Sequence, residues 1–428
     1  MIQQRNLEPR SGLKGEITVP GDKSISHRSI MLGSLAEGTT MVHGFLHGED
    51  NHATLNAFRA MGIEIRELEG GVLRIAGRGL DGLQEPQTVL DCGNSGTTIR
   101  LMTGLLAGQS FFSVLTGDRY LCKRPMKRVV GPLAAMGAQI WGRGGGDLAP
   151  LAIRGSKLRP ADYTSPIASA QVKSALMLAG LYAEGVTTVR EPHLSRDHSE
   201  RMLRYFGAEV QTFAGGVSIS GRPRLVGREV QVPGDISSAA FFLVAALITP
   251  GSELLIRNVG VNPTRSGIID ILKEMGGQLE LLNPRELSGE PVADILVRHS
   301  SLRGIEIGGE VVPRAIDEFP VVAVAASFAE GTTTIRDAKE LRVKETDRIA
   351  AMTAELTKLG GRIEAREDGM VVEGVEGLVG GTVSSQGDHR IAMSMAIASL
   401  RASGPVTIED TACTATSFPN FWDLLQGL

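Results

Sequence analysis

A phrase that recurs along the whole chain constrains the fold more than any other feature of the sequence. An apolar stretch is followed by a small residue, a glycine and a β-branched run, as in L-A-E-G-T-T at residues 35–40 and F-A-E-G-T-T-T at residues 328–334. The glycines of the six copies are Gly38, Gly108, Gly185, Gly251, Gly331 and Gly404. Their intervals are 70, 77, 66, 80 and 73 residues, so six units of about 71 residues account for the 428-residue chain.

A second phrase alternates with the first and keeps the same period. Its copies are M-G-I-E-I from Met61, M-G-A-Q-I from Met136, F-G-A-E-V from Phe206, M-G-G-Q-L from Met275 and L-G-G-R-I from Leu359. In each copy glycine ends a helical pattern and a strand pattern begins. The sixth copy would fall at the final L-L-Q-G-L. We therefore expect the N-terminal segment G-E-I-T-V-P, residues 15–20, to supply the missing strand of the sixth unit.

The string V-P-G-D occurs twice, at residues 19–22 and 232–235, and divides the repeats into two sets of three. Alternating helices and strands indicate an α/β protein. We therefore predict two pseudo-equivalent domains, one of residues 21–232 and one of residues 1–20 plus 233–428, with crossovers near 20 and 232–234. Short strings such as A-E-G also recur by chance, but chance does not explain two phrases alternating at one period.

Composition excludes several classes of function. A net charge of −4 and an aromatic content of 4% disfavour nucleic-acid binding. No apolar run reaches about 18 residues and no signal-peptide core is visible, so neither a membrane span nor secretion is expected. Cys92, Cys122 and Cys413 match no disulfide or zinc spacing, which favours the reducing cytoplasm.

Basic residues concentrate where the helices of the repeats are expected to begin. They are Lys23, Arg28, Arg100, Lys123, Arg124, Arg196, Lys344, Arg348 and Arg390. Equivalent helix N-termini face the same way, and each favours anions through unpaired N–H groups. Two facing domains would then form a positive cleft for a small ligand with several phosphates or carboxylates. The alternative interpretation is that these residues only cap helices or lie in solvent as surface charges. That interpretation is less convincing for nine residues at equivalent positions than for any one of them.

Carboxylates lie among these cations. Asp317 and Glu318 stand in I-D-E-F-P, and Glu345 in R-V-K-E-T-D-R. Such an acid can accept a proton from a hydroxyl or return one. The residues alone leave open that Asp317 only caps a helix and that Glu345 only pairs with a cation.

Several other kinds of site are not indicated. The glycine-rich G-N-S-G-T-T-I-R lacks the P-loop order, and no dinucleotide or metal motif is present, so no cofactor or metal is expected. His27 and His389 are interpreted as hydrogen-bond partners. Ser24 and Ser169 lack a serine–histidine–aspartate setting and are interpreted as ligand contacts.

The motifs together resemble the EPSP synthase family, the 3-phosphoshikimate 1-carboxyvinyltransferases. The stretches that carry the resemblance span nearly the whole chain in the family's order: P-G-D-K-S-I-S-H-R, G-N-S-G-T-T-I-R, K-R-P-M, A-S-A-Q-V-K-S-A, R-D-H-S-E-R-M-L, R-V-K-E-T-D-R and G-D-H-R-I-A-M. The resemblance implies two domains of three βαβαββ units each, an inside-out α/β barrel, with the active site in the interdomain cleft.

The resemblance also implies a reaction. The family transfers the enolpyruvyl group of phosphoenolpyruvate to the 5-hydroxyl of shikimate 3-phosphate through a tetrahedral intermediate and releases phosphate. This step belongs to the shikimate pathway of chorismate and aromatic amino acid biosynthesis, and the family is the target of glyphosate. A cytoplasmic monomer acting on small molecules, without nucleic acid or membrane, is expected.

Site residues follow by position. By resemblance, shikimate 3-phosphate is bound by Lys23, Ser24, Arg28, Ser169, Gln171, Arg196, Asp317 and Lys344. Phosphoenolpyruvate is bound by Lys23, Gly96, Arg124, Gln171, Arg348 and Arg390. Asp317 would accept the hydroxyl proton, and either Glu345 or Lys23 would protonate the methylene carbon.

Three positions depart from one branch of the family. Thr416 replaces a basic residue, Ala170 a serine and Glu340 an asparagine, as in the branch called class II. These departures leave the phosphate contacts and glyphosate sensitivity open, although Gly96 adds no side chain to the pocket.

Two other functions are alternatives to enolpyruvyl transfer to shikimate 3-phosphate. The related UDP-N-acetylglucosamine enolpyruvyltransferase carries a reactive cysteine several residues before R-P, whereas Cys122 precedes Arg124 by only two. A non-catalytic anion-binding protein would be expected to lose an acid such as Asp317 or Glu345, and both are present.

Overall fold

The computed structural model describes residues 3–428, and these residues divide into two compact units. The N-terminal unit comprises Gly21–Val232 with Glu286–Glu290. The C-terminal unit comprises the residues up to Pro20, Pro233–Arg285 and Pro291–Leu428. The chain passes between the units after Pro20 and after Val232, at the two V-P-G-D strings.

One short segment differs from the predicted division. Residues 286–290 form the tip of a long hairpin of the C-terminal unit, but they group with the N-terminal unit. The Glu290 carboxylate lies 2.7 Å from Nδ1 of His198, and the Ser288 hydroxyl accepts from the backbone N–H of Gln231 at 2.9 Å. Sequence patterns show where a hairpin begins and ends but not which residues its tip contacts.

Helices and strands alternate in both units. The helices of the N-terminal unit are α1 (Lys23–Leu35), α2 (Glu49–Ala60), α3 (Gly96–Ala107), α4 (Lys127–Ala135), α5 (Arg143–Gly146), α6 (Ala170–Gly180) and α7 (His198–Tyr205). Its strands are β3 (Glu37–His43), β4 (Glu64–Glu67), β5 (Leu73–Arg78), β6 (Leu90–Asp91), β7 (Phe112–Thr116), β8 (Gln139–Gly142), β9 (Leu148–Arg154), β10 (Asp162–Thr164), β11 (Val186–Arg190), β12 (Val210–Phe213), β13 (Gly216–Ser220) and β14 (Glu229–Gln231).

The C-terminal unit repeats the same order. Its helices are α8 (Ile236–Ile248), α9 (Gly267–Glu274), α10 (Val312–Ala315), α11 (Phe319–Ser327), α12 (Arg348–Lys358), α13 (His389–Ser399) and α14 (Phe421–Gln426). Its strands are β1 (Gln4–Leu7), β2 (Lys14–Thr18), β15 (Glu253–Gly260), β16 (Gln278–Leu287), β17 (Glu290–Arg298), β18 (Glu306–Ile307), β19 (Thr332–Ile335), β20 (Arg362–Arg366), β21 (Gly369–Glu373), β22 (Gly381–Ser384) and β23 (Val406–Glu409). Short 3-10 helices are η1 (Glu69–Gly71), η2 (Leu121–Lys123), η3 (Gly309–Val311), η4 (Lys339–Val343) and η5 (Thr411–Thr416).

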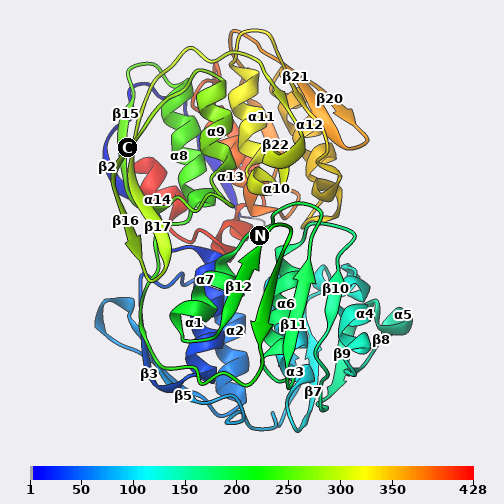
Figure 1. Ribbon diagram of the computed structural model, residues 1–428. Helices are drawn as coiled ribbons and strands as arrows, with labels where there is room; N and C mark the ends of the chain where they lie inside the picture. The colour runs from blue at the N-terminus through cyan, green and yellow to red at the C-terminus, as the bar shows by residue number, and fades with distance from the viewer. Residues whose placement is uncertain (1–2) are drawn as a thin grey trace. The chain divides into compact units, whose positions relative to one another are not determined.

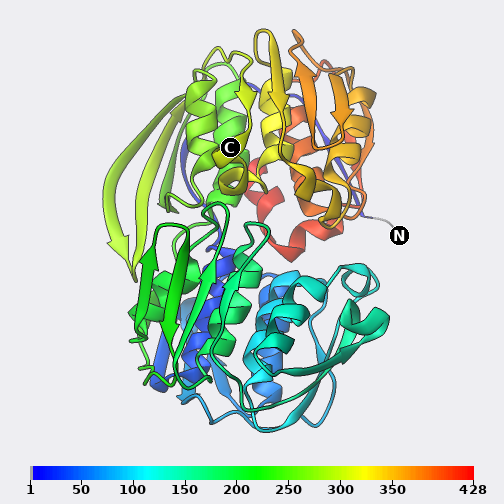
Figure 2. The same cartoon turned by 45° about the vertical axis from the view of Figure 1, so that its right-hand side comes forward.

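Each unit places its most apolar helices at the centre and its sheets outside (Figures 1 and 2). Every residue of α8 is buried, and so is nearly all of α1, α3, α6, α11 and α13. These helices carry apolar or small residues on all sides, which is the pattern of a helix enclosed by other elements. The sheets outside them expose one face, as the alternating burial along β13 and β19 shows.

The four-stranded sheets share one topology. In the sheet β6-β7-β9-β8, β6 and β7 are parallel, β9 is antiparallel to β7, and β8 is antiparallel to β9. The sheets β10-β11-β13-β12, β14-β3-β5-β4 and β18-β19-β21-β20 repeat this order. Two pseudo-equivalent domains, each of three βαβαββ units, are therefore confirmed.

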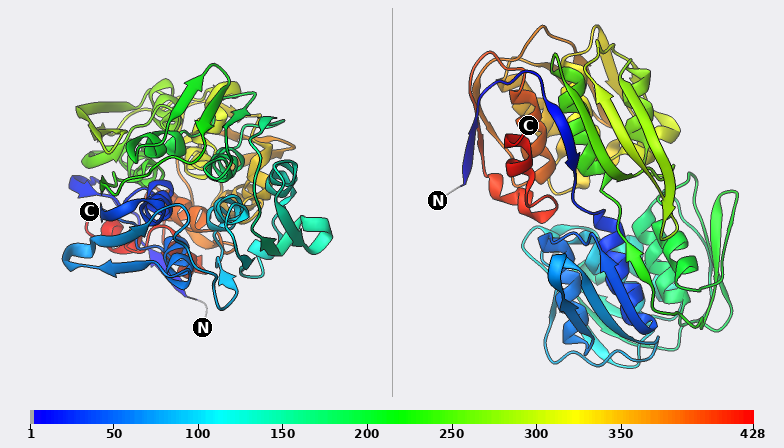
Figure 3. Two further views of the ribbon diagram at one scale, coloured as in Figure 1. Left: turned by 60° about the horizontal axis from the view of Figure 1, so that its bottom comes forward. Right: turned by 90° about the vertical axis from the view of Figure 1, so that its left-hand side faces the viewer.

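The prediction for the sixth unit is wrong about which strand completes it. The segment G-E-I-T-V-P lies in and after β2, which pairs in parallel with β15 of the fourth unit. The sixth sheet is completed by β1, which lies antiparallel to β23 in the order β1-β23-β22. Figure 3 (right) shows the two blue strands beside different sheets of the C-terminal unit.

This pairing explains why V-P-G-D is written twice. The first copy joins β2, a strand of the C-terminal unit, to α1 of the N-terminal unit. The second copy joins β14, a strand of the N-terminal unit, to α8 of the C-terminal unit. The first sheet of the N-terminal unit therefore contains β14, which comes just before α8 of the C-terminal unit. The first sheet of the C-terminal unit contains β2, which comes just before α1 of the N-terminal unit.

Glycine at the first join is required by a close backbone approach. A Cβ at Gly21 would lie 1.9 Å from the carbonyl oxygen of Gly44 and 3.0 Å from Cγ1 of Val232. Gly44 has a positive φ of 70°, and a Cβ there would lie 2.7 Å from the carbonyl oxygen of Val232, so the backbone is closely packed on this side as well. The join therefore tolerates no side chain at position 21.

We predict that Gly21→Ala lowers stability by about 2 kcal/mol or more, because the added methyl overlaps backbone atoms. For a unit of this size the melting temperature should fall by about 4–8 °C in differential scanning calorimetry. The matched control is Gly131→Ala in α4, where a Cβ meets nothing within 4 Å. This control should be neutral or slightly stabilising, and equal melting temperatures for the two variants would contradict the prediction.

Candidate active site

Most of the predicted site residues lie at helix N-termini that are capped by polar side chains. Asp22, Ser95 and Ser169 accept hydrogen bonds from the first turns of α1, α3 and α6. Asp347 and Asp388 do the same for α12 and α13. The expected cap fails at α11, which follows Glu318 without a capping bond and has proline in its first turn.

Lys23 begins α1 and is paired with a carboxylate that the sequence analysis did not single out. Its Nζ lies 2.5 Å from Oδ2 of Asp50, a buried residue of α2. Asn51 also donates to the backbone carbonyl of Lys23 at 3.1 Å. Asp50 lies in the polar H-G-E-D-N string at the start of α2, and this string is the sequence signal that could have identified it.

Gly96, Arg124 and Gln171 come together around a further arginine. Arg100 donates to Oε1 of Gln171 at 2.8 Å, and Gln171 donates to Thr97 at 3.2 Å. A Cβ at Gly96 would lie 2.6 Å from a terminal nitrogen of Arg100 and 3.1 Å from one of Arg124. The absence of a side chain at Gly96 therefore lets two guanidinium groups approach the N-terminus of α3.

Arg124 is oriented by the loop before α3. It donates to Oδ1 of Asn94 at 2.9 Å, and Asn94 donates to Oδ2 of Asp118 at 2.7 Å. Arg100 belongs to the basic residues noted in the sequence but was not carried into the predicted site. The hydrogen bond from Arg100 to Gln171 places Arg100 beside the predicted site residues.

The other predicted contacts of the N-terminal unit lie on neighbouring elements. Ser24 is half-buried in the first turn of α1, Ser169 caps α6, and Arg196 is half-buried in the segment before α7. Arg28 is buried one turn into α1. It donates to the hydroxyls of Ser199 and Ser174 at 2.7 and 2.8 Å.

His27 acts as a hydrogen-bond partner, as interpreted from the sequence. Its Nδ1 lies 2.8 Å from the hydroxyl of Thr54, which is 2.7 Å from that of Thr98. Burial, assisted by the charges of Lys23 and Arg28, holds the pKa of His27 well below its usual range. The imidazole is therefore neutral at pH 7 and links the starts of the three helices α1, α2 and α3.

In the C-terminal unit the predicted residues gather around one buried guanidinium. Arg348 begins α12 and is 1% exposed. It lies 2.8 Å from Asp388, 2.6 Å from Glu345 and 3.3 Å from Asp317. Burial disfavours its charge, but these three carboxylates together raise the pKa of Arg348 above its ordinary value.

Asp317, the predicted base, contacts two cations. Its Oδ1 lies 3.3 Å from Nζ of Lys344 as well as 3.3 Å from Arg348. Asp317, Lys344, Glu345 and Arg348 are thus brought together from two separate segments.

Arg390 stands at the start of α13 beside a second acid. One of its terminal nitrogens lies 3.9 Å from Oε1 of the buried Glu318, which also contacts the hydroxyl of Ser237. Asp388, which both caps α13 and pairs with Arg348, was missed as a site residue. Asp388 stands in the G-D-H-R-I-A string, which predicts a helix cap. Nothing in that string indicates its second contact, the ion pair with Arg348.

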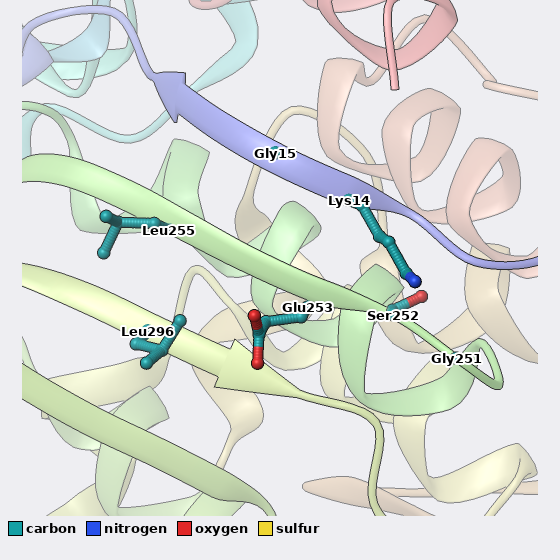
Figure 4. Close-up of a pocket in the computed structure, with 7 residues that line it drawn as sticks. All are labelled: Lys14, Gly15, Gly251, Ser252, Glu253, Leu255 and Leu296. Carbon is teal, nitrogen blue, oxygen red and sulfur yellow. The ribbon is translucent and has the colours of Figure 1, made fainter.

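The rest of residues 3–428 offers no second candidate active site. The cavity in Figure 4 is lined by Lys14, Gly15, Gly251, Ser252, Glu253, Leu255 and Leu296, none of them a predicted site residue. Among residues 3–428, no cluster of three or more His, Cys, Asp or Glu side chains could hold a metal ion. Within the same residues, no helix is long and apolar enough to span a membrane.

Comparisons with known proteins identify the family of the chain. A family model described as EPSP synthase (3-phosphoshikimate 1-carboxyvinyltransferase) matches residues 7–425. The chain belongs to the EPSP synthase family. A 3-phosphoshikimate 1-carboxyvinyltransferase of Syntrophotalea carbinolica is 68% identical over 428 residues, covering 100% of this chain and 99% of its own. One of Geotalea uraniireducens is 69% identical over 425 residues, covering 99% of each chain.

A solved EPSP synthase from Acinetobacter baumannii has the same fold. Its TM-score is 0.90 at 50% sequence identity, and the match covers 100% of this chain and 98% of that one. The predicted family and its enzymatic function as a shikimate-pathway transferase are confirmed by these relatives. The UDP-N-acetylglucosamine alternative is not supported.

Proposed function

We propose that this EPSP synthase family member joins phosphoenolpyruvate to the 5-hydroxyl of shikimate 3-phosphate with the side chains described above. Both substrates are small and carry phosphate and carboxylate groups, which suit guanidinium forks and capped helix N-termini. The observation that carries the proposal is the gathering of Asp317, Lys344 and Glu345 around Arg348.

Substrate binding is assigned mainly to the N-terminal unit. Lys23, Ser24, Arg28, Ser169, Gln171 and Arg196 would bind shikimate 3-phosphate together with Asp317 and Lys344. Lys23, Gly96, Arg124 and Gln171 would bind phosphoenolpyruvate together with Arg348 and Arg390. Arg100 joins the second set because it donates to Gln171 and lies against Gly96.

The chemistry begins at Asp317. Its carboxylate accepts the proton of the 5-hydroxyl while the hydroxyl oxygen bonds to the central carbon of phosphoenolpyruvate. The methylene carbon takes a proton from Glu345 or Lys23, which gives the tetrahedral intermediate. Loss of a proton from the resulting methyl group, together with loss of phosphate, then restores the double bond in the product. Arg348 holds Glu345 and Asp317 in place for these transfers.

Three further assignments rest on the sequence. Thr416, Ala170 and Glu340 support assignment of the chain to the class II-like branch. A monomeric state is proposed from the resemblance. Cytoplasmic location is supported by Cys92, Cys122 and Cys413, which are free thiols in the part of the chain described.

Purified enzyme given shikimate 3-phosphate and phosphoenolpyruvate should release one phosphate for each molecule of product. A coupled phosphate-release assay measures this directly. The control replaces shikimate 3-phosphate with UDP-N-acetylglucosamine and should give no release. Folded protein that releases no phosphate with shikimate 3-phosphate would refute the proposed function.

Asp317→Ala should lower kcat by roughly 100-fold or more, because it removes the group that accepts the hydroxyl proton. Binding of shikimate 3-phosphate, measured by calorimetry, should persist. The control is Glu364→Ala, which removes an exposed carboxylate paired with Arg366 in the same unit and should leave kcat unchanged. Near-normal turnover of the Asp317 variant would exclude Asp317 as the base.

A further inference from the structure

Arg28 differs from Arg348 in the kind of group that holds it. Arg348 lies among three carboxylates. The hydrogen-bond partners of Arg28 within residues 3–428 are neutral: the hydroxyls of Ser199 and Ser174, and the backbone carbonyl of Ser24 at 3.0 Å. Arg28 is only 6% exposed, so water does not replace a missing counter-charge. Its positive charge is therefore oriented without being cancelled by a direct ion pair.

The hydrogen-bonding capacity of Arg28 is only partly used. A guanidinium carries five N–H groups. Nε donates to Ser199, one terminal nitrogen donates to Ser174, and the other donates to the Ser24 carbonyl. One N–H on each terminal nitrogen then has no protein partner among residues 3–428. Two such groups suit a bidentate contact with an anion.

The two serine hydroxyls form a fixed pair. They lie 2.6 Å apart and come from different helices, Ser174 from α6 and Ser199 from α7. The neighbouring residues on the same helices, Lys173 and Glu200, form a buried ion pair at 2.8 Å. This pair joins α6 to α7 next to the hydroxyls and so helps to hold the two helices, and the serines on them, together.

Electrostatics are consistent with this geometry. Burial lowers the pKa of Arg28 to about 10, while the more distant charges of Glu200, Asp22 and Glu290 act in the opposite direction. The guanidinium thus stays protonated at neutral pH. A carboxylate in place of either hydroxyl would keep the orientation but would offset the charge.

We propose that Ser174 and Ser199 are positioning residues for shikimate 3-phosphate: they fix the Arg28 fork through neutral hydrogen bonds and leave its charge and two N–H groups for the substrate. This inference rests on the proposed function and deepens it, since it names the residues that prepare one of its binding groups. Neither serine touches the reacting atoms.

The test is steady-state kinetics of Ser174→Ala and Ser199→Ala. Loss of a hydrogen bond to a charged group corresponds to an increase of about 10-fold or more in KM for shikimate 3-phosphate. The KM for phosphoenolpyruvate should change little. In the double variant, KM for shikimate 3-phosphate should rise by less than the product of the two single increases, because both hydroxyls hold the same guanidinium group. The control is Ser34→Ala in α1, whose buried hydroxyl has no hydrogen-bond partner in residues 3–428.

A second measurement separates positioning from a merely structural role. In an Arg28→Lys background, the ammonium cannot make the same two-point contact with the serine pair. Adding Ser199→Ala there should change KM for shikimate 3-phosphate by less than about twofold, because the interaction is already lost. A structural role predicts the same loss in both backgrounds.

Each outcome bears on one claim. Unchanged KM in the serine variants, or an equal effect in the Arg28→Lys background, overturns the positioning role while wild-type turnover continues. If the wild-type protein in the same series releases no phosphate, the proposed function itself fails. A selective rise in KM that disappears with Arg28→Lys supports the inference.

Discussion

Complete burial of the central helices is the constraint on which the rest of the structure depends. A helix such as α8 or α11 has no face on which to carry a charge without burying it among apolar groups. Charged side chains can be accommodated at the helix N-terminus, where backbone N–H groups are unpaired and caps are needed. Lys23, Arg348 and Arg390 lie at or next to such starts. The architecture of the core thus directs the chemistry to one end of each helix.

The repeats share a backbone but not a chemistry. After V-P-G-D the N-terminal unit has Lys23 and Arg28, whereas the C-terminal unit has Ile236 and Phe241 at the matching places. The N-terminal unit holds its cation at Arg28 with neutral hydroxyls, which suits binding of an anion. The C-terminal unit surrounds Arg348 with carboxylates, which suits proton transfer. One arrangement of helices and sheets therefore holds a buried arginine in two different ways.

The sequence predicted the features that repeat and missed those that depend on contacts between distant segments. Period and glycine placement were enough for the α/β units and for the crossovers at V-P-G-D. They could not show that β1, with no apolar alternation in Q-R-N-L, completes the sixth sheet in place of the more strand-like G-E-I-T-V-P. Asp50 and Asp388 were missed for a similar reason, since each pairs with a cation of another helix. Ordinary buried serines such as Ser174 carry no sequence signal at all.

The central claim is that binding by Arg28 and proton transfer by Asp317 act on one substrate molecule, although the two residues belong to different units of the fold. A crystal structure of the enzyme with shikimate 3-phosphate tests this most directly. The account predicts a single bound molecule with one anionic group within hydrogen-bond distance of Arg28 and its 5-hydroxyl within the same reach of the Asp317 carboxylate. A bound molecule that contacts Arg28 while its 5-hydroxyl lies out of reach of Asp317 would contradict it.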